Sequence, residues 1–519
     1  MATKRRKPTK KKSSRKKAAK KKSARKPAKK KSAKKKSAKK KPARKSVKKK
    51  PARKPAKKKA AKKKSARKPA APAISTVVDI IRVHAKNLSG KVALVQGDRV
   101  QTWQELYKRS AQVAQALKAA GVGNQDRVAF LDKNSIEHFE VFYGCAMLNA
   151  VSVDINFRLA PPEVAFIVND SQAKVFIVGP DFVPVLDAIA GDLPHTKKIV
   201  VIGGHPTHES YESWVARHSA VDPGATAKPH DVAFQLYSSG TTGRPKGVML
   251  TNDNFLGILP SARDLWGMNE QAINLIAMPL FHIGGSGWAT AGQYNGCKSI
   301  ILRETADVGG IVKMIGEHRI THAFMVPALL AFTLMVPDVD KADFSSLKLI
   351  AYGASPISEQ VLAASLKTFK CNFVQVYGLT ETTGVVTMLM HEDHDVDGPR
   401  KHLLRSCGKP SLGVELKIVD EQGKELPATQ VGEIIIRSKQ VMKGYWNMPQ
   451  ETAKSIRNGW FYTGDAGYKD KEGYVYIHDR VKDMIVSGGE NVYPAEVENA
   501  LMKHPRSEEH TSELQSHSF

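Results

Sequence analysis

Cysteine is scarce in this sequence. The four thiols, Cys145, Cys297, Cys371 and Cys407, lie far apart and form no CxxC pair. This spacing suggests neither a disulfide scaffold nor a zinc site, so we expect reduced thiols in a cytosolic protein. Long apolar runs are also missing: none approaches the roughly 18 residues that span a bilayer, and no apolar signal-peptide core follows the basic N-terminus. We therefore expect a cytoplasmic protein.

Acidic and aromatic side chains are absent from the first 70 residues. Met1 to Ala70 hold 39 of the 82 lysines and arginines, so the rest of the chain carries 43 basic against 49 acidic side chains. The string KKKSARKPA occurs at Lys20 to Ala28 and again at Lys62 to Ala70. Like charges repel and nothing here can form a core, so residues 1–72 are predicted to be a disordered tail.

The composition of this tail resembles that of linker histones and bacterial lysine-rich histone-like proteins. Its cations would release counterions on binding DNA, and without aromatic residues to stack on bases the contact should be independent of sequence. Polyphosphate or an anionic membrane surface would satisfy the same electrostatics. We therefore predict that the tail contacts a polyanion and that the protein can associate with the nucleoid. The alternatives are a tail that is merely solvated and a start codon that is misplaced.

From about Ile74 the pattern becomes globular. Short β-branched runs such as RVAFL, VSVDI, KSIILRE and LKLIAYGAS alternate with helical stretches, among them SEQVLAASLKTF and a helix near Ser135 to Asn149. This alternation predicts an α/β fold of layers with substantial parallel sheet. After about Gly408 the glycine-punctuated runs VELKIVD and GEIIIRS predict a smaller β-rich subdomain.

The stretch Tyr237 to Val248, YSSGTTGRPKGV, follows the apolar run VAFQLY and is crowded with hydroxyls and glycines. Glycines let backbone N–H groups form an anion nest, and hydroxyls and a lysine add donors and charge. The groups that would face a phosphate are Ser238, Ser239, Gly240, Thr241, Thr242, Gly243 and Lys246. Pro245 and Gly247 around the lysine exclude a Walker A motif. The stretch predicts a phosphate-binding loop; a plain flexible linker is the alternative.

This loop resembles the signature of the adenylate-forming, or AMP-binding, superfamily of acyl-CoA synthetases, firefly-type luciferases and peptide-synthetase adenylation domains. Three more motifs follow in the family's order: YGLTE (Tyr377 to Glu381), YTGD (Tyr462 to Asp465) and DRVKDMIVSGGENVYPAEVE (Asp479 to Glu498). The resemblance covers about Ile74 to Pro505. It implies a large adenylation domain over residues 73–481, then a hinge and the start of a small C-terminal domain over residues 482–505.

The resemblance also implies roles for individual residues. Glu381 resembles the magnesium carboxylate and Thr380 a phosphate contact, which makes Lys246, His282, Thr380 and Glu381 the predicted catalytic residues. Those predicted to bind the nucleotide are Gly353, Ala354 and Ser355 at the purine, Tyr377 and Gly378 against adenine, Asp465 at the ribose and Arg480 near the ribose and phosphate. Lys482 resembles the hinge residue, and Gly488 and Gly489 the part that approaches coenzyme A.

Two further stretches have competing interpretations. His282, in PLFH, matches the family position that shields the reacting carboxylate, although a lone histidine after an apolar strand is also typical of a satisfied core residue. The glycines after it could leave room for an acyl chain, with Trp288 as a wall. His391 to His402, HEDHDVDGPRKH, mixes imidazoles and carboxylates, but its composition indicates a solvated loop rather than a metal site.

The reaction implied is ATP- and Mg²⁺-dependent activation of a carboxylic acid to an acyl-adenylate, followed by transfer to coenzyme A, with AMP and pyrophosphate as products. The resemblance favours a fatty acid. An aryl-CoA ligase and a peptide-synthetase adenylation domain are alternatives. A polyanion-binding, nucleoid-associated protein is an alternative of another class, and it is compatible with an enzyme that carries a basic tail.

The end of the sequence departs from the family pattern. After VENALMKHP the family has a strand resembling VxEAAVVG and, much later, a catalytic lysine, whereas this chain continues RSEEHTSELQSHSF. RSEEHTSELQS can be written as the in-frame translation of a sequencing-library adapter, so our hypothesis is that residues 506–519 are translated adapter. We expect such a chain to adenylate at a small fraction of the normal rate and to form almost no thioester.

Overall fold

The computed structural model describes residues 74–238, 244–480, 485–487 and 490–492, with side chains as far as His478. The predicted tail, the hinge Lys482, the paired glycines Gly488 and Gly489, and residues 506–519 lie outside the described residues. No helix in the described part of the chain is long and apolar enough to cross a membrane.

One mixed sheet has eight strands in the described residues, in the order β19-β9-β8-β4-β3-β5-β6-β7. From β8 to β7 all neighbours are parallel, whereas β9 and β19 are antiparallel additions at one edge. The strands are β3 (Arg127–Leu131), β4 (Val151–Asp154), β5 (Val175–Val178), β6 (Lys198–Val201), β7 (Glu209–Ser210), β8 (Val232–Ser238), β9 (Lys246–Thr251) and β19 (Gly444–Tyr445).

A second mixed sheet has nine strands among the described residues, in the order β16-β15-β14-β13-β12-β10-β11-β1-β2. Its central strands are parallel, and the strands at both edges, β15 and β16 on one side and β2 on the other, are antiparallel to their neighbours. The strands are β1 (Val92–Gln96), β2 (Arg99–Thr102), β10 (Ile273–Ile276), β11 (Lys298–Ile301), β12 (His322–Met325), β13 (Leu349–Gly353), β14 (Asn372–Leu379), β15 (Gly384–Leu389) and β16 (Lys409–Pro410).

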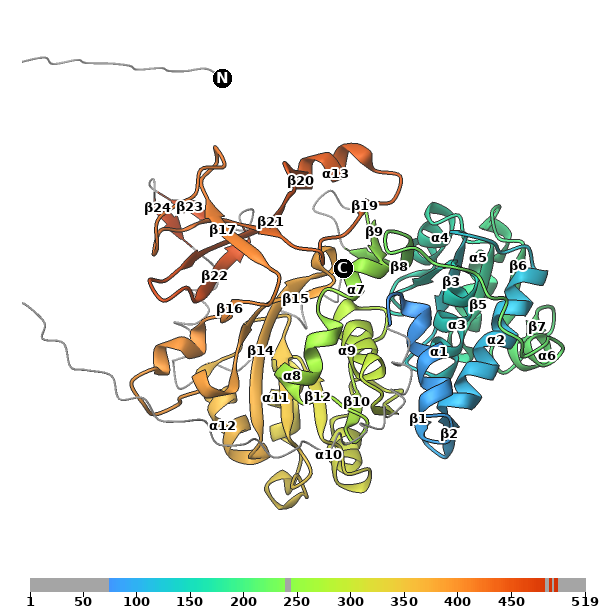
Figure 1. The fold of residues 1–519 in the computed structure, drawn as a ribbon, viewed down its shortest axis with the longest axis horizontal. Helices are drawn as coiled ribbons and strands as arrows, with labels where there is room; N and C mark the ends of the chain where they lie inside the picture. Colours follow the sequence, from blue (N-terminus) through green and yellow to red (C-terminus); the bar gives the residue numbers. More distant parts are fainter. Residues whose placement is uncertain (1–73, 239–243, 481–484, 488–489, 493–519) are drawn as a thin grey trace, which may run out of the picture. The chain divides into compact units, whose positions relative to one another are not determined.

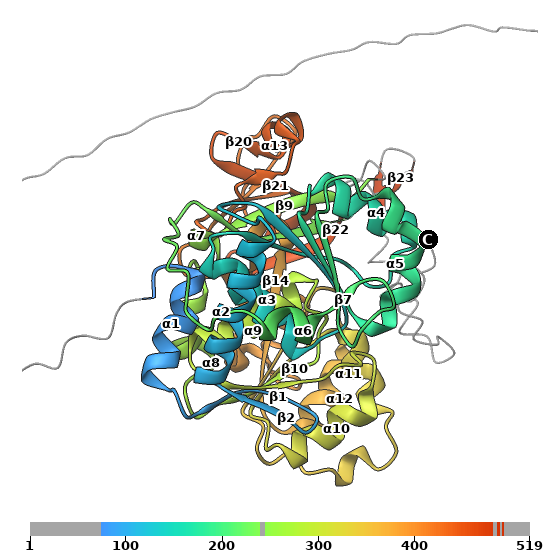
Figure 2. The same cartoon turned by 90° about the vertical axis from the view of Figure 1, so that its right-hand side faces the viewer.

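Helices cover both faces of both sheets, in five layers (Figures 1 and 2). Successive strand residues point to opposite faces, so Leu349 and Ala351 of β13 join the core between the sheets, while Ile350 and Tyr352 join the outer core. The inner layer is α1 (Val77–Asn87), α2 (Trp103–Ala119), α3 (Ile136–Met147), α6 (Tyr211–Ala216) and α9 (Ile283–Tyr294). The outer layers are α10 (Val308–Glu317), α11 (Pro327–Leu334) and α12 (Glu359–Phe369) on the nine-stranded sheet, and α4 (Pro161–Asp170) and α5 (Val183–Ile189) on the other.

Short helices complete the connections. They are α7 (Asn252–Phe255), α8 (Ala262–Trp266), α13 (Pro449–Ser455), and the 3-10 turns η1 (Pro180–Phe182), η2 (Ala190–Asp192), η3 (Leu259–Ser261), η4 (Val339–Lys341), η5 (Thr380–Thr382), η6 (His391–Asp393) and η7 (Lys401–Arg405).

The predicted β-rich subdomain is an antiparallel sheet of five strands in the described residues, with a small apolar core of its own. The runs VELKIVD and GEIIIRS become β17 (Glu415–Val419) and β18 (Gly432–Arg437), followed by β20 (Ile456–Arg457), β21 (Trp460–Lys469) and β22 (Val475–Arg480). A separate hairpin joins β23 (Ile485–Ser487) and β24 (Glu490–Val492). The predicted layered α/β fold with a β-rich subdomain is therefore confirmed.

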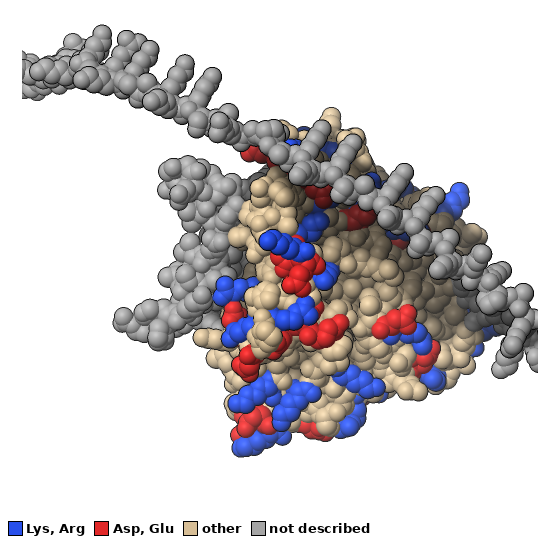
Figure 3. Space-filling model, turned by 60° about the vertical axis from the view of Figure 1, so that its left-hand side comes forward, with Lys and Arg blue, Asp and Glu red and all other residues tan. Residues whose placement is uncertain are grey.

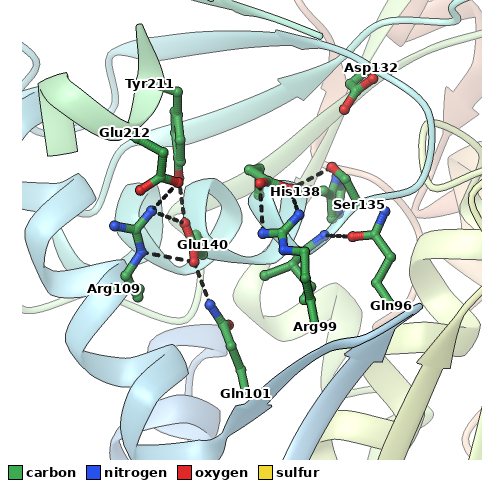
Figure 4. A network of polar contacts seen from close by, with 12 residues as sticks. Gln96, Arg99, Gln101, Arg109, Asp132, Ser135, His138, Glu140, Tyr211 and Glu212 are labelled. Carbon is green, nitrogen blue, oxygen red and sulfur yellow. Dashed lines mark hydrogen bonds and ion pairs between the residues drawn. The ribbon is translucent and has the colours of Figure 1, made fainter. Parts of the chain in front are cut away.

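A polar network ties the inner helices together at α3 (Figure 4). Glu140 is 1% exposed. Its carboxylate accepts hydrogen bonds from Arg109 of α2 at 3.0 and 3.1 Å, from Gln101 of β2 at 2.6 Å and from the Tyr211 hydroxyl at 2.8 Å. Arg109 also pairs with the exposed Glu212. Several donors thus compensate the desolvation of one buried carboxylate.

Candidate active site

The hydroxyl-rich stretch connects the two strands of a β-hairpin. β8 and β9 are antiparallel, with Ser238 opposite Lys246 and Tyr237 opposite Gly247. Ser239 to Gly243 lie outside the described residues. A Walker loop leads from a strand into a helix, whereas this stretch leads into an antiparallel strand. The backbone therefore agrees with the exclusion of a Walker A motif.

The stem of this hairpin is tightly packed. A side chain at Gly247 would place its Cβ 2.6 Å from Nε2 of Gln235 and 3.2 Å from Cβ of Trp446. The Trp446 indole donates to the Asp170 carbonyl at 2.8 Å, and the Arg127 guanidinium lies 3.5 Å from the Trp446 ring centroid. Burial lowers the pKa of Arg127 to about 10. The start of β9 is therefore closely packed against Gln235 and Trp446.

Glu381 lies at the carboxyl end of β14, facing the hairpin, and is 9% exposed. Ser238 Oγ donates to its Oε1 at 3.0 Å, and the Tyr445 hydroxyl donates to the same oxygen at 3.1 Å. Burial and then the charge of Glu381 raise the pKa of Tyr445, so its hydroxyl stays protonated and keeps donating. No donor among the described residues contacts Oε2 of Glu381. Two hydroxyl donors from the described residues thus hold one oxygen of this carboxylate.

Lys246 is almost buried at the start of β9. Its Nζ donates to Glu451 Oε2 of α13 at 3.0 Å and lies 5.0 Å from the ring centroid of Tyr445. Lys454 donates to the other oxygen of Glu451 at 2.7 Å. Hydrogen bonds from Lys454 and then Lys246 lower the pKa of Glu451 to about 2, so this carboxylate is ionised at neutral pH.

Backbones pack closely at the ends of β13 and β14, next to Glu381. A Cβ at Gly353 would lie 2.0 Å from the Val376 carbonyl oxygen, and one at Gly378 would lie 1.7 Å from that of Gly384. Ala354, next along the chain, has a positive φ of 72°. Ser355 and Thr380 are half-buried at the same edge. The structure therefore brings the predicted purine and phosphate residues together where two backbones approach closely.

Tyr377 and Asp465 form a direct pair. The Tyr377 hydroxyl donates to Asp465 Oδ2 at 2.6 Å, and burial followed by the Asp465 charge raises the pKa of Tyr377 well above its usual value. Asp465 of β21 stands opposite Arg480 of β22 in the sheet register. The side chain of Arg480 lies outside the described part of the chain. The predicted adenine and ribose residues are therefore neighbours across two sheets.

An apolar cavity of about 100 Å³ is lined in part by Tyr377. The Trp288 and Trp266 rings lie 5.6 Å apart, and Phe324 lies 6.0 Å from Trp288. The wall is made by Phe255, Ile258, Leu259, Trp266, Ile283, Gly284, Gly287, Trp288, Ala291, Phe324, Ala351, Ala354, Val376, Tyr377, Gly378, Thr383, Gly384 and Val385. The expectation that Trp288 and the glycines near it border a pocket is confirmed.

The glycines of α9 set the position of this wall. A Cβ at Gly285 would lie 2.0 Å from the Pro279 carbonyl oxygen, and one at Gly292 would lie 2.6 Å from Nδ2 of Asn274. The helix can therefore lie close against β10, and its side chains form one face of the cavity. His282 is the exposed N-cap of this helix, and the cavity wall begins at the next residue, Ile283.

The histidine-rich stretch after β15 is engaged within the protein. His394 contacts the Met390 carbonyl through Nδ1 at 2.9 Å and the Tyr352 hydroxyl through Nε2 at 3.0 Å, and burial lowers its pKa to about 4. Asp393 pairs with Arg400 at 2.9 Å and accepts the Tyr474 hydroxyl at 2.9 Å. No group of three or more potential metal ligands occurs among the described residues.

The comparisons with known proteins agree with this geometry. A family model described as AMP-binding enzyme matches residues 81–446. The chain belongs to the AMP-binding enzyme family. Its relatives and structural neighbours include CoA ligases and synthetases, and this AMP-binding enzyme is accordingly an AMP-forming acid–thiol ligase.

Three similar proteins illustrate the range of substrates named for proteins that this chain resembles. The enzyme is 40% identical over 445 residues to the fatty acid–[acyl-carrier-protein] ligase ScoC of Streptomyces coeruleorubidus, covering 84% of this chain and 82% of that one. It is 35% identical over 408 residues to the long-chain-fatty-acid–CoA ligase FadD13 of Mycobacterium tuberculosis, covering 78% of each. Its fold matches the crystal structure of the anthranilate CoA ligase AuaEII in complex with anthranoyl-AMP, with a TM-score of 0.77, 29% identity and coverage of 83% and 82%.

Sequence reasoning missed Tyr445 and Glu451. They occur in GYWNMPQET, where the proline at the first position of α13 is the readable signal and predicts only a helix start. Their contacts with Glu381 and Lys246 join segments more than 60 residues apart in the chain. Only the tertiary structure brings them to the site.

Proposed function

We propose that this AMP-binding enzyme activates a fatty acid with ATP and transfers the acyl group to the thiol of coenzyme A. The observation that carries this proposal is the apolar cavity, whose wall includes Ala354, Tyr377 and Gly378, which are assigned to the nucleotide, together with Trp266 and Trp288. An acid lying in it would place its carboxylate beside the residues assigned to the nucleotide, as adenylation requires.

The described residues fit the nucleotide. The absent side chains of Gly353 and Gly378 let neighbouring backbone pack closely at this edge, where Tyr377 and Ser355 also lie and where the purine is assigned. Asp465 is assigned to the ribose together with Arg480, and Lys246, Thr380 and the hydroxyls of Ser238, Ser239, Thr241 and Thr242 to the phosphates, with Gly240 and Gly243 supplying backbone N–H groups. The fixed donors would stabilise the charge that develops on the phosphates.

Glu381 is suited to Mg²⁺, because a hard cation prefers anionic oxygen and Oε2 has no protein donor among the described residues. When bound, the ion would neutralise charge on the phosphates. The Ser238 hydroxyl and Tyr445 hydroxyl orient the carboxylate through Oε1.

In the first half-reaction an oxygen of the substrate carboxylate forms a bond to the α-phosphorus of ATP, and pyrophosphate leaves. His282, at the start of α9, is assigned to shield that carboxylate from water. In the second half-reaction the thiol sulfur bonds to the acyl carbon, AMP leaves, and the thiol proton is released. Lys482 is assigned to the hinge between these steps, and Gly488 and Gly489 to the approach of coenzyme A.

An aromatic acid is the second candidate substrate. The neighbouring rings of Trp266, Trp288 and Phe324 all line the cavity, and such walls stack on aryl groups as readily as they pack on alkyl chains. A carrier-protein thiol is the second candidate acceptor, because the name of the Streptomyces coeruleorubidus relative includes an acyl-carrier protein.

A panel of acids decides between these candidates. ATP-dependent pyrophosphate release is measured with short-, medium- and long-chain fatty acids, aryl acids and amino acids, and thioester formation is then measured with coenzyme A and with a phosphopantetheinylated carrier protein. We expect the highest kcat/KM with a fatty acid and thioester formation on coenzyme A. Preference for an aryl or amino acid would reject the fatty-acid assignment, and transfer to the carrier protein alone would reject coenzyme A.

We also propose that residues 1–70 bind a polyanion without sequence preference. Figure 3 shows lysine, arginine and acidic side chains interspersed on one face of the described surface. The excess of positive charge lies in the N-terminal residues, since the remainder of the chain carries 43 basic against 49 acidic side chains.

A further inference from the structure

Tyr445 lies between the two ionic groups assigned to ATP and Mg²⁺. Its ring centroid is 5.0 Å from Nζ of Lys246, and its hydroxyl donates to Oε1 of Glu381 at 3.1 Å. One aromatic side chain therefore contacts a cation through its ring and an anion through its polar end. A lysine and a glutamate in a nearly buried site attract each other strongly, and a direct pair would occupy both groups.

Glu451 supplies the second contact that keeps Lys246 away from Glu381. It accepts the Lys246 Nζ at 3.0 Å and is itself held by Lys454 at 2.7 Å. Its low pKa keeps it charged throughout the neutral range. Lys246 thus pairs with Glu451, and the donors to Glu381 within the described part of the chain are the neutral hydroxyls of Ser238 and Tyr445.

Both residues belong to one short segment, Gly444–Ser455, that is fixed to the hairpin. Gly444 and Tyr445 pair with Met249 and Val248 of β9, and the Trp446 N–H donates to the Gly247 carbonyl at 2.7 Å. The Tyr445 N–H donates to Thr452 Oγ1 of α13 at 2.9 Å, which folds the helix back over the strand. The segment therefore presents Tyr445 and Glu451 to the site from a single backbone support.

We propose that Tyr445 and Glu451 are positioning residues that keep Lys246 and Glu381 from pairing with each other, so that Glu381 is oriented for Mg²⁺ and Lys246 is held in place for the phosphates of ATP. This inference rests on the proposed function. It assigns separate effects to the two residues: Tyr445 acts on the metal through Glu381, and Glu451 acts on the nucleotide through Lys246.

The test measures ATP binding by equilibrium dialysis, without the acid, over a range of Mg²⁺ concentrations. Tyr445→Phe keeps the ring and removes the hydroxyl, so we expect the Mg²⁺ midpoint to rise about tenfold while ATP affinity at saturating Mg²⁺ is nearly unchanged. Glu451→Gln keeps the shape and removes the charge, so we expect ATP affinity at saturating Mg²⁺ to fall about tenfold with an unchanged Mg²⁺ midpoint.

Matched controls separate positioning from stability. Tyr143→Phe removes a comparable buried hydroxyl, which donates to Gln293 at 2.6 Å between α3 and α9. Lys313→Gln removes an exposed lysine of α10 that pairs with Glu317, away from the site. Both should leave the two binding constants near those of the wild-type enzyme, and melting temperatures of all variants are recorded.

The outcomes are distinct. The crossed pattern, with the Mg²⁺ midpoint moved by one variant and ATP affinity by the other, supports the inference. Variants that change both constants together, or only the melting temperature, overturn it while wild-type ATP binding preserves the proposed function. A wild-type enzyme that does not bind ATP overturns both.

Discussion

The negative charge of Glu381 should contribute more to kcat than the hydrogen bonds that its side chain accepts. Glu381→Gln keeps an oxygen acceptor for Ser238 and Tyr445 but gives a hard cation no anionic ligand. We expect kcat for pyrophosphate release to fall by on the order of 100-fold with little change in melting temperature. Glu317→Gln, which alters an exposed carboxylate on α10, should have no effect on kcat. Comparable kcat for Glu381→Gln and wild type would show that Glu381 is not a metal ligand.

Gly378 is constrained by the backbone across the strand. A Cβ there would lie 1.7 Å from the Gly384 carbonyl oxygen, at the irregularity between β14 and β15. Because a backbone atom cannot move aside cheaply, Gly378→Ala should lower the free energy of unfolding by about 1–3 kcal/mol and weaken ATP binding. Urea denaturation and dialysis measure the two effects. Gly90→Ala has no atom within 4 Å of its new Cβ and should behave as wild type; equal stability of both variants would contradict the prediction.

Between elements, the buried carboxylate of α3 should hold several helices together. Glu140→Ala would leave Arg109, Gln101 and Tyr211 without their common acceptor, so the free energy of unfolding should fall by about 3–5 kcal/mol in urea denaturation. Glu212 shares Arg109 but is 65% exposed in its side chain. Glu212→Ala should cost at most about 1 kcal/mol. A similar loss for both variants would mean that burial does not decide the strength of this network.

The contact between β13 and the turn η6 should make stability depend on pH. Burial holds the pKa of His394 at about 4, against 6.5 in an unfolded chain. Between these values the unfolded chain binds a proton that the folded one excludes, so stability falls as pH falls from 6.5 to 4, by about 3 kcal/mol in total. His394→Gln does not titrate, and its unfolding free energy should decline less over this window. Parallel declines for variant and wild type would assign the effect to other groups.

The elements that could be predicted were those whose sequence pattern is local. Arg127 to Leu131 and Val232 to Ser238 are apolar runs long enough to be read as strands, and both are strands. The strand that begins at Lys246 was missed, because a lysine and a glycine begin it and its pairing with β8 depends on the turn. The order of strands within each sheet is set by contacts between distant segments, which no local pattern encodes.

Across the whole molecule, site residues that lie in a sequence motif could be predicted, whereas site residues that are brought there by tertiary contacts could not. Lys246 and Glu381 could be predicted as candidate site residues, since each lies in a dense motif. The structure places both in contact with the side chain of Tyr445. Tyr445 and Glu451 could not, because their function depends on a segment that pairs with β9 late in the chain. The site therefore has a part that the sequence reveals and a supporting part that appears only in three dimensions.

The positive charge of the molecule is concentrated in residues 1–70, and this distribution gives a last prediction. Deleting residues 1–70 removes 39 cations and leaves a chain with 43 basic and 49 acidic side chains. In a gel shift with duplex DNA, we expect the full chain to bind and the shortened chain not to bind. The logarithm of the binding constant should fall linearly with the logarithm of salt concentration, with a slope of about −0.9 per phosphate neutralised. DNA of unrelated sequence should bind equally, since phosphate contacts carry no base information.

As a control, the kinetics of the full chain and of the chain without residues 1–70 are compared. Pyrophosphate release by the two proteins should agree at moderate salt, because the residues assigned to ATP and the acid all lie beyond residue 237. If both proteins bind DNA equally, the contact belongs to the folded part and the tail is not the polyanion-binding element. If deletion instead changes KM for ATP, the tail acts on the site through its attraction for the polyphosphate of the nucleotide, and the effect should then weaken as salt screens it.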